Sequence, residues 1–568
     1  MSQNSQVSRR TLMAGGLAGL AGLAFTQVGT VTRATAAAGT GLDGFPAGVE
    51  LARGVFRNWD GTIVTDQLWT ATVRGPDDVR SVTQWAADAG YRLRPRGYGH
   101  SWSPLVADTG TAATARVVMV DTTAMTAMSM VGAERVRVQA GAKMSDLLAF
   151  LSEHGRSVIG APAPGDITVG GALAVNGHGT NLPRSGEVPP SGATYGSLSN
   201  TIVELTASVW DDEAGAYVLK TFPRTDPDIA ALLVSLGRTL VTEVVLQTVP
   251  NYSIRCRNYT HLHRATLFAA PASAGDQSLA SLVSKHGRVG LIWFAMTDYP
   301  WVQLWDVEPQ RPLLSRPVYS PYNYPFADRL PDAVAQLIGQ VTEGSGALTP
   351  VATNAQLTAA VVGLTATGAR DMWGEARHFI HFVRPTTLRV SAGSHVVLAR
   401  RDDLQEIVHQ FTQHYLGLIE QFRQRGLYPA NNTCEIRITG LDHPGESVVD
   451  GAQTASLSAI APVPGRPELD TAIWLDVLTL PGTAGADELF AGLEQWFYDL
   501  PADLGVARPE WAKRFSTTPG VGSWTDTVDL TQRIPSVLPA FAEAVSTFER
   551  LDPRGVFRAQ LHDRLMPE

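Results

Sequence analysis

The sequence predicts an α+β protein whose first part folds into two small lobes around a ligand. Strands and helices alternate, but the strand runs are short and glycines lie densely between them, unlike the pattern of one large parallel sheet. No Gly-x-Gly-x-x-Gly motif follows a first strand, so a dinucleotide-binding βαβ unit is not indicated. The 568 residues are too many for one compact core, so two or more domains are expected.

Periodicity and stop signals place the first elements. Residues 76–89 are predicted to be a helix because apolar residues recur on one side and Gly90 follows. Residues 145–154 are predicted to be a second helix, closed by Gly155. The other expectations are strands over 91–94, 116–120, 135–139, 202–210, 217–222 and 240–249, with a helix over 228–236.

Composition excludes several classes of function. The hydrophobic fraction of 44% and the charged fraction of 17% are ordinary for a soluble globular protein. The net charge is −9 and no basic run stands out, so no nucleic-acid partner is expected. Cys256 and Cys434 have no CxxC spacing and no Cys/His cluster, so we expect two buried free thiols and no metal site.

The run from residue 94 to residue 105, RPRGYGHSWSPL, is the most informative part of the chain. Its two glycines allow the backbone to approach a bulky anionic ligand. His100 beside them is a nucleophile that can bond covalently to an electrophilic cofactor, which together with two arginines suggests a flavin tether. Glycine clusters at 170–171 and 177–179 can free backbone N–H groups to cradle a pyrophosphate, although tight turns alone would also explain them.

The N-terminus is predicted to be a signal peptide over residues 1–36. Residues 8–13, SRRTLM, carry a twin-arginine pattern, and a small-residue cleavage site follows at 34–36. The apolar stretch between them is about a dozen residues, short of the ~20 that span a membrane. This pattern indicates export of an already folded protein from a bacterium, a route that suits a cofactor inserted before export.

Residues 433–439, TCEIRIT, alternate like a strand, so Glu435 and Arg437 are expected on one face. Taken alone, such a pair is most simply a surface ion pair of minor energy. From about residue 259 onward aromatic residues also gather, which predicts a packed core and allows a large apolar pocket. The segment 552–568 closes the chain with Val556 and Phe557 as its apolar anchor.

Several of these segments resemble a known family. The runs 96–102, 163–165 and 168–179 resemble the flavin-tethering region of the vanillyl-alcohol-oxidase superfamily. The run 194–200, TYGSLSN, followed by VELT at 203–206, is similar to the bacterial cholesterol oxidases that carry covalent FAD. Further matches lie at 321–324, 371–374, 386–389, 435–437 and 472–475, so the resemblance extends from about residue 45 to the C-terminus.

The resemblance implies a two-lobed FAD-binding domain of the vanillyl-alcohol-oxidase type, formed by residues 45–258 and a C-terminal return segment, 529–568. An α+β substrate-binding domain, 259–528, is inserted between them. It implies covalent FAD, with His100 bonded to the 8α-methyl carbon of the flavin, and leaves His178 as a rival tether. The implied cofactor-binding residues are Arg96, Gly97, Tyr98, Gly99, His100, Ser101, Trp102, Pro164, Gly165, Thr168, Gly170, Gly171, Asn176, Gly177, His178, Gly179, Tyr195, Gly196, Ser197, Asn200 and Val203.

The resemblance also implies catalytic roles. Glu435 is the general base on the substrate hydroxyl, and Arg437 steadies the developing oxyanion and the reduced flavin. Asp298 stands where the family has a glutamate associated with the steroid double-bond shift; the shorter side chain displaces the carboxylate by roughly 1 Å, which can lower a rate ~10²-fold. Asp476 stands where the family has an asparagine thought to pair with the active-site arginine and gate oxygen. Asp298 could instead be a turn residue, and Asp476 a strand-end residue without a partner.

The expected function is therefore that of a secreted cholesterol (3β-hydroxysteroid) oxidase that uses O₂ and releases H₂O₂, with double-bond isomerisation left open. One alternative is an oxidase or dehydrogenase of another bulky secondary alcohol on the same scaffold, and another is a non-catalytic sterol-binding or flavin-storing protein. The expected partners are the sterol, molecular oxygen, the twin-arginine export machinery and, transiently, a membrane from which the sterol is drawn.

Overall fold

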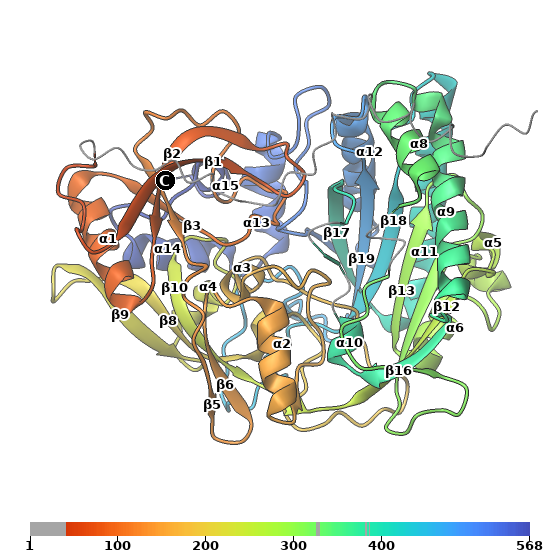
Figure 1. Ribbon diagram of the computed structural model, residues 1–568, viewed down its shortest axis with the longest axis horizontal. Helices are drawn as coiled ribbons and strands as arrows, with labels where there is room; N and C mark the ends of the chain where they lie inside the picture. Colours follow the sequence, from red (N-terminus) through yellow and green to blue (C-terminus); the bar gives the residue numbers. More distant parts are fainter. Residues whose placement is uncertain (1–40, 325–329, 381–382, 385–386, 568) are drawn as a thin grey trace, which may run out of the picture.

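The computed structural model describes residues 41–567 except 325–329, 381–382 and 385–386. It has two parts, visible side by side in Figure 1: two small sheets lie near the chain start, and one large sheet lies on the other side of the molecule. The predicted signal peptide lies outside the described residues.

The first lobe is a four-stranded sheet in the order β1-β2-β4-β3, covered by helix α1. The helix covers residues 76–89, as predicted, and it ends because Gly90 takes the left-handed conformation at φ 69°. The strands are β1 (Glu50–Arg57), β2 (Val64–Thr72), β3 (Arg92–Arg96) and β4 (Val117–Asp121), and the helix is α1 (Pro76–Ala89).

The second lobe is a five-stranded antiparallel sheet in the order β5-β6-β10-β8-β9. The prediction of a helix over 228–236 was too long, because the helix covers only residues 229–232 and positive φ excludes Leu236 from any helical continuation. The elements are β5 (Met128–Val131), β6 (Arg135–Gln139), β8 (Ile202–Asp211), β9 (Ala216–Pro223), β10 (Leu240–Gln247), α2 (Met144–Glu153), α3 (Val169–Ala174) and α4 (Ile229–Leu232). Two separate small sheets confirm the predicted pair of lobes.

The second part is a nine-stranded sheet in the order β15-β16-β12-β14-β13-β18-β19-β17-β20. Helices α6, α11 and α12 bury one face of it in a continuous apolar core. The strands are β12 (Ser253–Tyr259), β13 (Arg288–Phe294), β14 (Trp301–Val307), β15 (Arg316–Val318), β16 (Asp371–Glu375), β17 (Ser391–Ala399), β18 (Thr433–Thr439), β19 (Thr471–Thr479) and β20 (Gly505–Pro509); the helices are α6 (Leu279–His286), α11 (Leu404–Gln424) and α12 (Ala486–Tyr498).

The opposite face of the nine-stranded sheet carries helix α9 (Thr349–Ala366) and an aromatic-rich cluster, and it turns toward the first domain. Many of the aromatics gathered after residue 259 therefore do pack in a core. The remaining described elements are β7 (Arg156–Ser157), β11 (Val249–Pro250), α5 (Arg264–Leu267), α8 (Asp332–Thr342), α10 (Arg377–Ile380), α13 (Ile534–Val537), α14 (Phe541–Leu551), α15 (Gln560–Leu565), the single turns η1 (Leu198–Thr201), η2 (Pro271–Ser273), η3 (Gly346–Leu348), η4 (Arg401–Asp403) and η5 (Pro444–Glu446), and the π-helical turn η6 (Asp529–Arg533).

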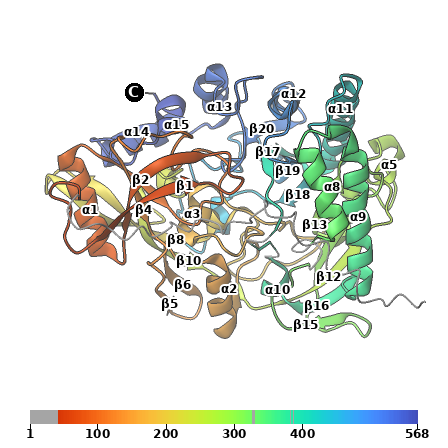
Figure 2. The ribbon, with the colours of Figure 1, turned by 45° about the horizontal axis from the view of Figure 1, so that its top comes forward.

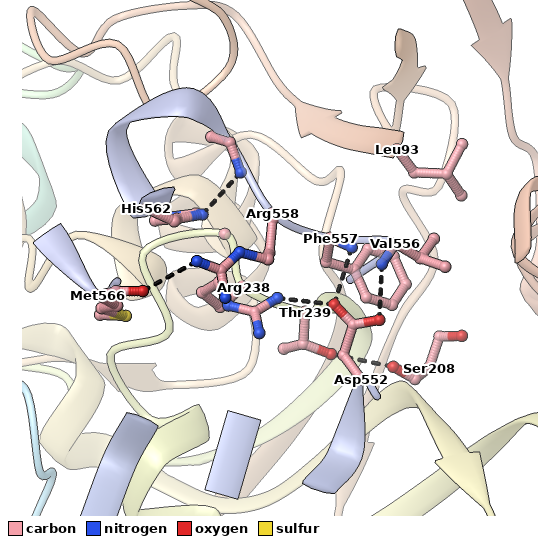
Figure 3. A network of polar contacts seen from close by, with 12 residues as sticks. Leu93, Ser208, Arg238, Thr239, Asp552, Val556, Phe557, Arg558, His562 and Met566 are labelled. Carbon is pink, nitrogen blue, oxygen red and sulfur yellow. Dashed lines mark hydrogen bonds and ion pairs between the residues drawn. The ribbon is translucent and has the colours of Figure 1, made fainter. Parts of the chain in front are cut away.

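The chain end returns to the first domain, where Figure 2 shows α14 and α15 above the elements of the chain start. Figure 3 shows the polar contacts that fix it: the buried Asp552 carboxylate accepts hydrogen bonds from Arg238 (2.6 Å) and from the backbone N–H groups of Val556 (2.8 Å) and Phe557 (2.9 Å). The backbone N–H of Leu93, next to the predicted tether loop, donates to the carbonyl of Val556 at 2.7 Å. The C-terminal segment therefore supports the strand from which that loop begins.

The two cysteines are buried and unbonded to each other, as predicted. Cys256 lies on β12 and Cys434 on β18, two strands of the same sheet whose side chains belong to different core clusters. Their separate environments explain why no disulfide forms between them.

Candidate active site

One cavity of about 380 Å³ lies between the two lobes and the nine-stranded sheet. Its walls come from two loop regions of the first domain, 95–106 and 159–180, and from side chains on β13, β14 and β18. The volume falls within the range of ligand pockets, ~300–1,000 Å³. The glycine-rich loops and the Glu435–Arg437 strand, far apart in sequence, therefore line one space.

His100 lines this cavity with a free imidazole. Its ring stacks on Trp59 with centroids 4.0 Å apart, and Trp102 meets it edge-on at 5.9 Å. Burial lowers the pKa of His100 to about 3, and the nearby charges of Lys513 and Arg389 act in the same direction. At this pKa the imidazole is neutral and keeps a lone pair, and within the described chain neither ring nitrogen makes a hydrogen bond.

His178, the rival tether, is held differently. Its ring stacks on Trp474 at 3.6 Å with the planes 9° apart. Its Nδ1 lies 3.1 Å from the carbonyl of Gly179, and its Nε2 lies 3.6 Å from a carboxylate oxygen of Glu510. Because both nitrogens already face polar partners, His178 is the poorer candidate for a covalent bond to a flavin.

The backbone of the two loops is packed so closely that side chains could not be added. A Cβ on Gly97 would collide with the side chain of Thr168, and one on Gly170 would collide with Ala140. The start of the tether loop is fixed by a buried ion pair of 2.5 Å between Arg96 and Asp121. This close-packed, glycine-lined cradle with a free imidazole fits a flavin dinucleotide.

The cavity brings together most of the predicted cofactor residues. Those that line it are Arg96, Gly97, Tyr98, Gly99, His100, Ser101, Trp102, Pro164, Thr168, Gly170, Gly171, Asn176, Gly177, His178 and Gly179. Six other predicted residues do not line it, and for these direct cofactor contact stays a prediction: Gly165, Tyr195, Gly196, Ser197, Asn200 and Val203.

The run 194–200 instead joins the two domains. The buried Asp442 carboxylate accepts hydrogen bonds from Ser197 (backbone N 2.6 Å, Oγ 2.8 Å) and from Asn176 Nδ2 (3.0 Å). Asn200 donates to the carbonyl of His443 at 3.1 Å, and the backbone N–H of Tyr195 donates to another carboxylate of the same loop. These residues therefore position Asn176 and the glycine turn that follows it.

On the sheet side of the cavity, five charged groups form a chain. Arg437 donates to Glu435 and, at 2.6 Å, to Asp476 Oδ2. Lys513 Nζ lies 3.5 Å from Asp476 and 3.8 Å from Glu510. The sequence analysis allowed Asp476 either to pair with the active-site arginine or to have no partner. In the structure it is paired with Arg437. In this chain, three carboxylates face the two cations Arg437 and Lys513.

Strand register explains this arrangement. Glu435 on β18 lies directly opposite Asp476 on β19, which lies opposite Ser394 on β17. Directly opposed residues of antiparallel strands share a face, so the three side chains form a row. Ser394 donates a hydrogen bond to Asp476, which fixes the carboxylate behind Arg437.

Burial and mutual attraction shift the proton affinities of this chain. Burial acts to lower the pKa of Arg437, but Glu435 and Asp476 raise it above its usual value. Burial raises the pKa of Asp476, against the opposing effect of Lys513. Burial likewise acts to lower the pKa of Lys513, but Asp476 and Glu510 raise it, and Lys513 in turn lowers the pKa of Glu510. Both cations are firmly charged. Burial acts to raise the pKa of both Asp476 and Glu510, but it is Asp476 whose pKa stays above its usual value.

The raised pKa of Asp476 predicts a pH dependence of stability. Because its folded pKa lies above its unfolded value of about 3.9, the contribution of Asp476 is complete below about pH 4 and is lost as the pH rises through the folded pKa. Asp476→Asn should therefore flatten the fall of Tm above pH 4, measured by circular dichroism. Asp298→Asn, at an exposed carboxylate, is the control; a wild-type slope in Asp476→Asn would contradict the assignment.

Asp298 does not belong to this site, contrary to the prediction. Its side chain is 57% exposed and pairs with Arg264 (Nε to Oδ1 3.0 Å). It follows Met296, which takes a positive φ of 62°, in the connection between β13 and β14, and it does not line the cavity. Asp298 is therefore a turn residue, the alternative given above, because the β13–β14 connection carries its side chain away from the cavity-facing side of the sheet.

Sequence reasoning missed Glu510 and Lys513, both of which line the cavity. They follow directly after β20 and form a Glu-x-x-Lys spacing without any periodic or glycine-rich context. Only the packing of β20 beside β17, at the edge of the sheet, brings them to Asp476.

Comparisons with known proteins agree with this geometry. A family model described as cholesterol oxidase, substrate-binding, matches residues 253–567, and one described as FAD binding domain matches residues 69–207. A solved structure of a solvent-stable cholesterol oxidase is 41% identical, covering 93% of this chain and 100% of that one at a TM-score of 0.90. A histidine-to-alanine variant of the cholesterol oxidase from Brevibacterium sterolicum is 34% identical, covering 92% and 99% at 0.89.

A more distant similarity is to L-gulonolactone oxidase of Mus musculus, 27% identical over 247 residues, which are 43% of this chain and about half (49%) of that protein. The fold, the cavity and these matches define an FAD-dependent oxidoreductase. More narrowly, the chain belongs to the cholesterol oxidase family, as a flavoenzyme with an FAD-binding and a substrate-binding domain.

Proposed function

We propose that this protein is an exported enzyme that oxidises the 3β-hydroxyl of cholesterol or a related sterol to a ketone. In the overall reaction two electrons and two protons leave the alcohol and reduce O₂ to H₂O₂. The supporting observation is that Glu435 and Arg437 line the same cavity as the free imidazole of His100. A peroxide-coupled assay over sterols and other bulky secondary alcohols tests it, and it would fail if sterols gave no peroxide.

The chain supplies proton transfer and charge, while FAD, when bound, supplies the acceptor of the hydride. Two carboxylates among the described residues line the cavity, Glu435 and Glu510. Glu435, which lies beside Arg437, takes the hydroxyl proton. Arg437, held between Glu435 and Asp476, keeps a positive charge where the substrate oxygen becomes negative. Aromatic and aliphatic side chains along β13 and β14 exclude water from the rest of the wall.

We further propose that FAD is attached covalently through His100. His100→Ala should leave FAD bound but dissociable, because the cradle remains while the nucleophile is lost. Acid precipitation measures this: the wild-type pellet should stay yellow, and the variant should release its pigment into the supernatant. His178→Ala is the matched control and should keep a yellow pellet; a colourless pellet from the wild-type protein would contradict the proposal.

Oxygen use follows from the same charge chain. Asp476 places an additional ionisable group against Arg437, so we propose that the reaction with oxygen depends on the protonation of Asp476. The alternative of electron transfer to another acceptor rests on this same departure from the family. The pH profile of kcat/KM for O₂, measured for wild type and Asp476→Asn, tests whether the protonation of Asp476 controls the reaction with oxygen. A profile unchanged by the substitution would count against a role of Asp476 in oxygen use.

Double-bond isomerisation requires a carboxylate at the cavity, and Glu435 and Glu510 are the two carboxylates of the described chain that line it. Asp298 is not proposed for this step, because it pairs with Arg264 outside the cavity. The proportion of conjugated to unconjugated ketone among the products would show whether the step occurs.

Export and membrane contact complete the proposal. Export by the twin-arginine route rests on residues 1–36, and the proposal would fail if secreted protein began at Met1.

Membrane contact is proposed for helix α9, which carries no charged residue and exposes Val351 and Val362. Within the described residues, one helical stretch, Gly346–Ala366, is long and apolar enough to cross a membrane, a property that core helices share. Co-sedimentation with phosphatidylcholine vesicles tests surface contact.

A further inference from the structure

The cavity continues along the sheet, away from Glu435 and Arg437. Arg437 on β18 lies directly opposite Gly290 on β13, and Gly290 lies directly opposite Gln303 on β14. The three residues therefore share one face in one row, and Gln303 lies two strand spacings, about 9.5 Å, from Arg437. This separation is comparable with the length of a fused four-ring nucleus.

The wall between these two points is largely apolar. Gly290 has no side chain, and the ring of Trp305 covers its backbone so closely that a Cβ there would touch the ring. Ile254 and Ile292 also line this stretch. The one charged side chain here, Arg288, has both terminal nitrogens engaged by Glu187, at 3.0 and 2.8 Å. The neutral polar side chains in this part of the wall are Gln303 and Thr180, and Gln303 is the one in the row with Arg437.

A hydrogen-bond network fixes which end of the Gln303 amide faces its neighbours. Asn258 donates from Nδ2 to the carbonyl of Ala369 (2.7 Å), so its Oδ1 is the acceptor for Trp301 Nε1 (2.8 Å) and for the Tyr324 hydroxyl (3.3 Å). The Tyr324 oxygen is left to accept, and Gln303 Nε2 donates to it at 3.3 Å. The amide nitrogen of Gln303 thus points into this network.

The amide oxygen is consequently turned away from the network. Gln303 is 2% exposed and lines the cavity, and its carbonyl oxygen makes no hydrogen bond within the described residues. An amide oxygen that faces the cavity without a protein partner is open to a hydrogen-bond donor from a ligand or from water.

We propose that Gln303 forms a second polar subsite that accepts a hydrogen bond from a hydroxyl at the end of the steroid nucleus remote from the reacting 3β-hydroxyl. The proposal rests on the proposed function. It assigns a substrate preference: 3β-hydroxysteroids with a 17β-hydroxyl are favoured over those with a 17-ketone. A hydroxyl can donate a hydrogen bond to the amide oxygen of Gln303, whereas a ketone oxygen can only accept one.

The test compares androst-5-ene-3β,17β-diol with the corresponding 17-ketone in the holoenzyme. One hydrogen bond corresponds to about a tenfold preference in kcat/KM for the diol. Gln303→Leu should abolish most of this preference. Tyr324→Phe should reduce the preference for the diol, because the Gln303 amide, no longer bonded to the Tyr324 hydroxyl, can turn its N–H toward the ligand. Ile292→Val, a change in the same wall without a polar atom, should keep it.

Binding supplies an independent readout. Kd values for the two steroids, from the change in flavin absorbance on titration of Glu435→Gln holoenzyme with and without Gln303→Leu, should show the same tenfold discrimination and its loss. Equal affinity for diol and ketone in the wild-type cavity, or a preference that survives Gln303→Leu, would overturn the subsite. Discrimination in binding without any turnover of sterols by wild-type enzyme would instead overturn the proposed function and leave the subsite standing.

Discussion

Replacing Glu435 with glutamine is expected to lower kcat by about 10²–10⁴-fold while the protein keeps its FAD. Glutamine preserves the shape and can still accept from Arg437, but it cannot take up the proton of the substrate hydroxyl. Steady-state peroxide production measures kcat, and the flavin absorbance of the purified variant measures FAD content.

The matched control for this change is Asp298→Asn, which makes the same carboxylate-to-amide replacement at an exposed ion pair with Arg264. It should keep kcat within about twofold, because surface ion pairs contribute little. A Glu435→Gln variant with near-normal kcat would remove Glu435 from the mechanism. A large loss in Asp298→Asn would return Asp298 to the catalytic site.

Lys513→Met is expected to cause the largest loss of stability, about 3–5 kcal/mol in the free energy of unfolding. Lys513 is largely buried between the carboxylates of Asp476 and Glu510, at 3.5 and 3.8 Å. Methionine keeps much of the volume but leaves a buried excess of negative charge that Arg437 alone does not balance. Chemical and thermal unfolding followed by circular dichroism measure the effect.

Lys143→Met is the matched control for this substitution. Lys143 pairs with Asp166 at 3.0 Å, but both side chains are about one-third exposed. Its replacement should change stability by less than about 1 kcal/mol. Equal losses of stability in the two lysine variants would show that Lys513 does not balance the buried charges of Asp476 and Glu510.

The parts of the fold that the sequence predicted well were those with local signals. Helix α1 begins at Pro76 and is ended by left-handed Gly90, and β18 covers 433–439 with Glu435 and Arg437 on its cavity face. In each case neighbouring residues decide the conformation, through a stop signal or through alternation. The predicted helix over 228–236 was too long because Leu236 takes a positive φ, which apolar spacing does not indicate.

The parts of the site that the sequence missed depend on contacts distant in the chain. Glu510 and Lys513 reach the cavity because β20 pairs with β17, which no local pattern around them indicates. The run at 194–200 matched the family well, yet its side chains bond to Asp442 and its neighbours instead of lining the cavity. A sequence motif shared with a family can therefore serve to join two domains as well as to contact a cofactor.

Asp298 shows the limit of carrying a role over by position alone. The aspartate lies beside aromatic residues that do pack in the substrate-binding domain, but it falls in the connection after β13, where the chain turns away from the cavity face. Alternation along a strand indicates a face, whereas a connection gives no such indication. The side chain consequently finds a partner, Arg264, at the surface.

Sterol oxidation at the flavin is tested most directly by anaerobic addition of cholesterol to the purified yellow holoenzyme. The visible flavin absorbance should bleach at one equivalent of sterol, and admitted air should restore the colour with formation of one equivalent of H₂O₂. Absorbance that stays unchanged with excess cholesterol, in protein shown to contain FAD, would contradict this reaction.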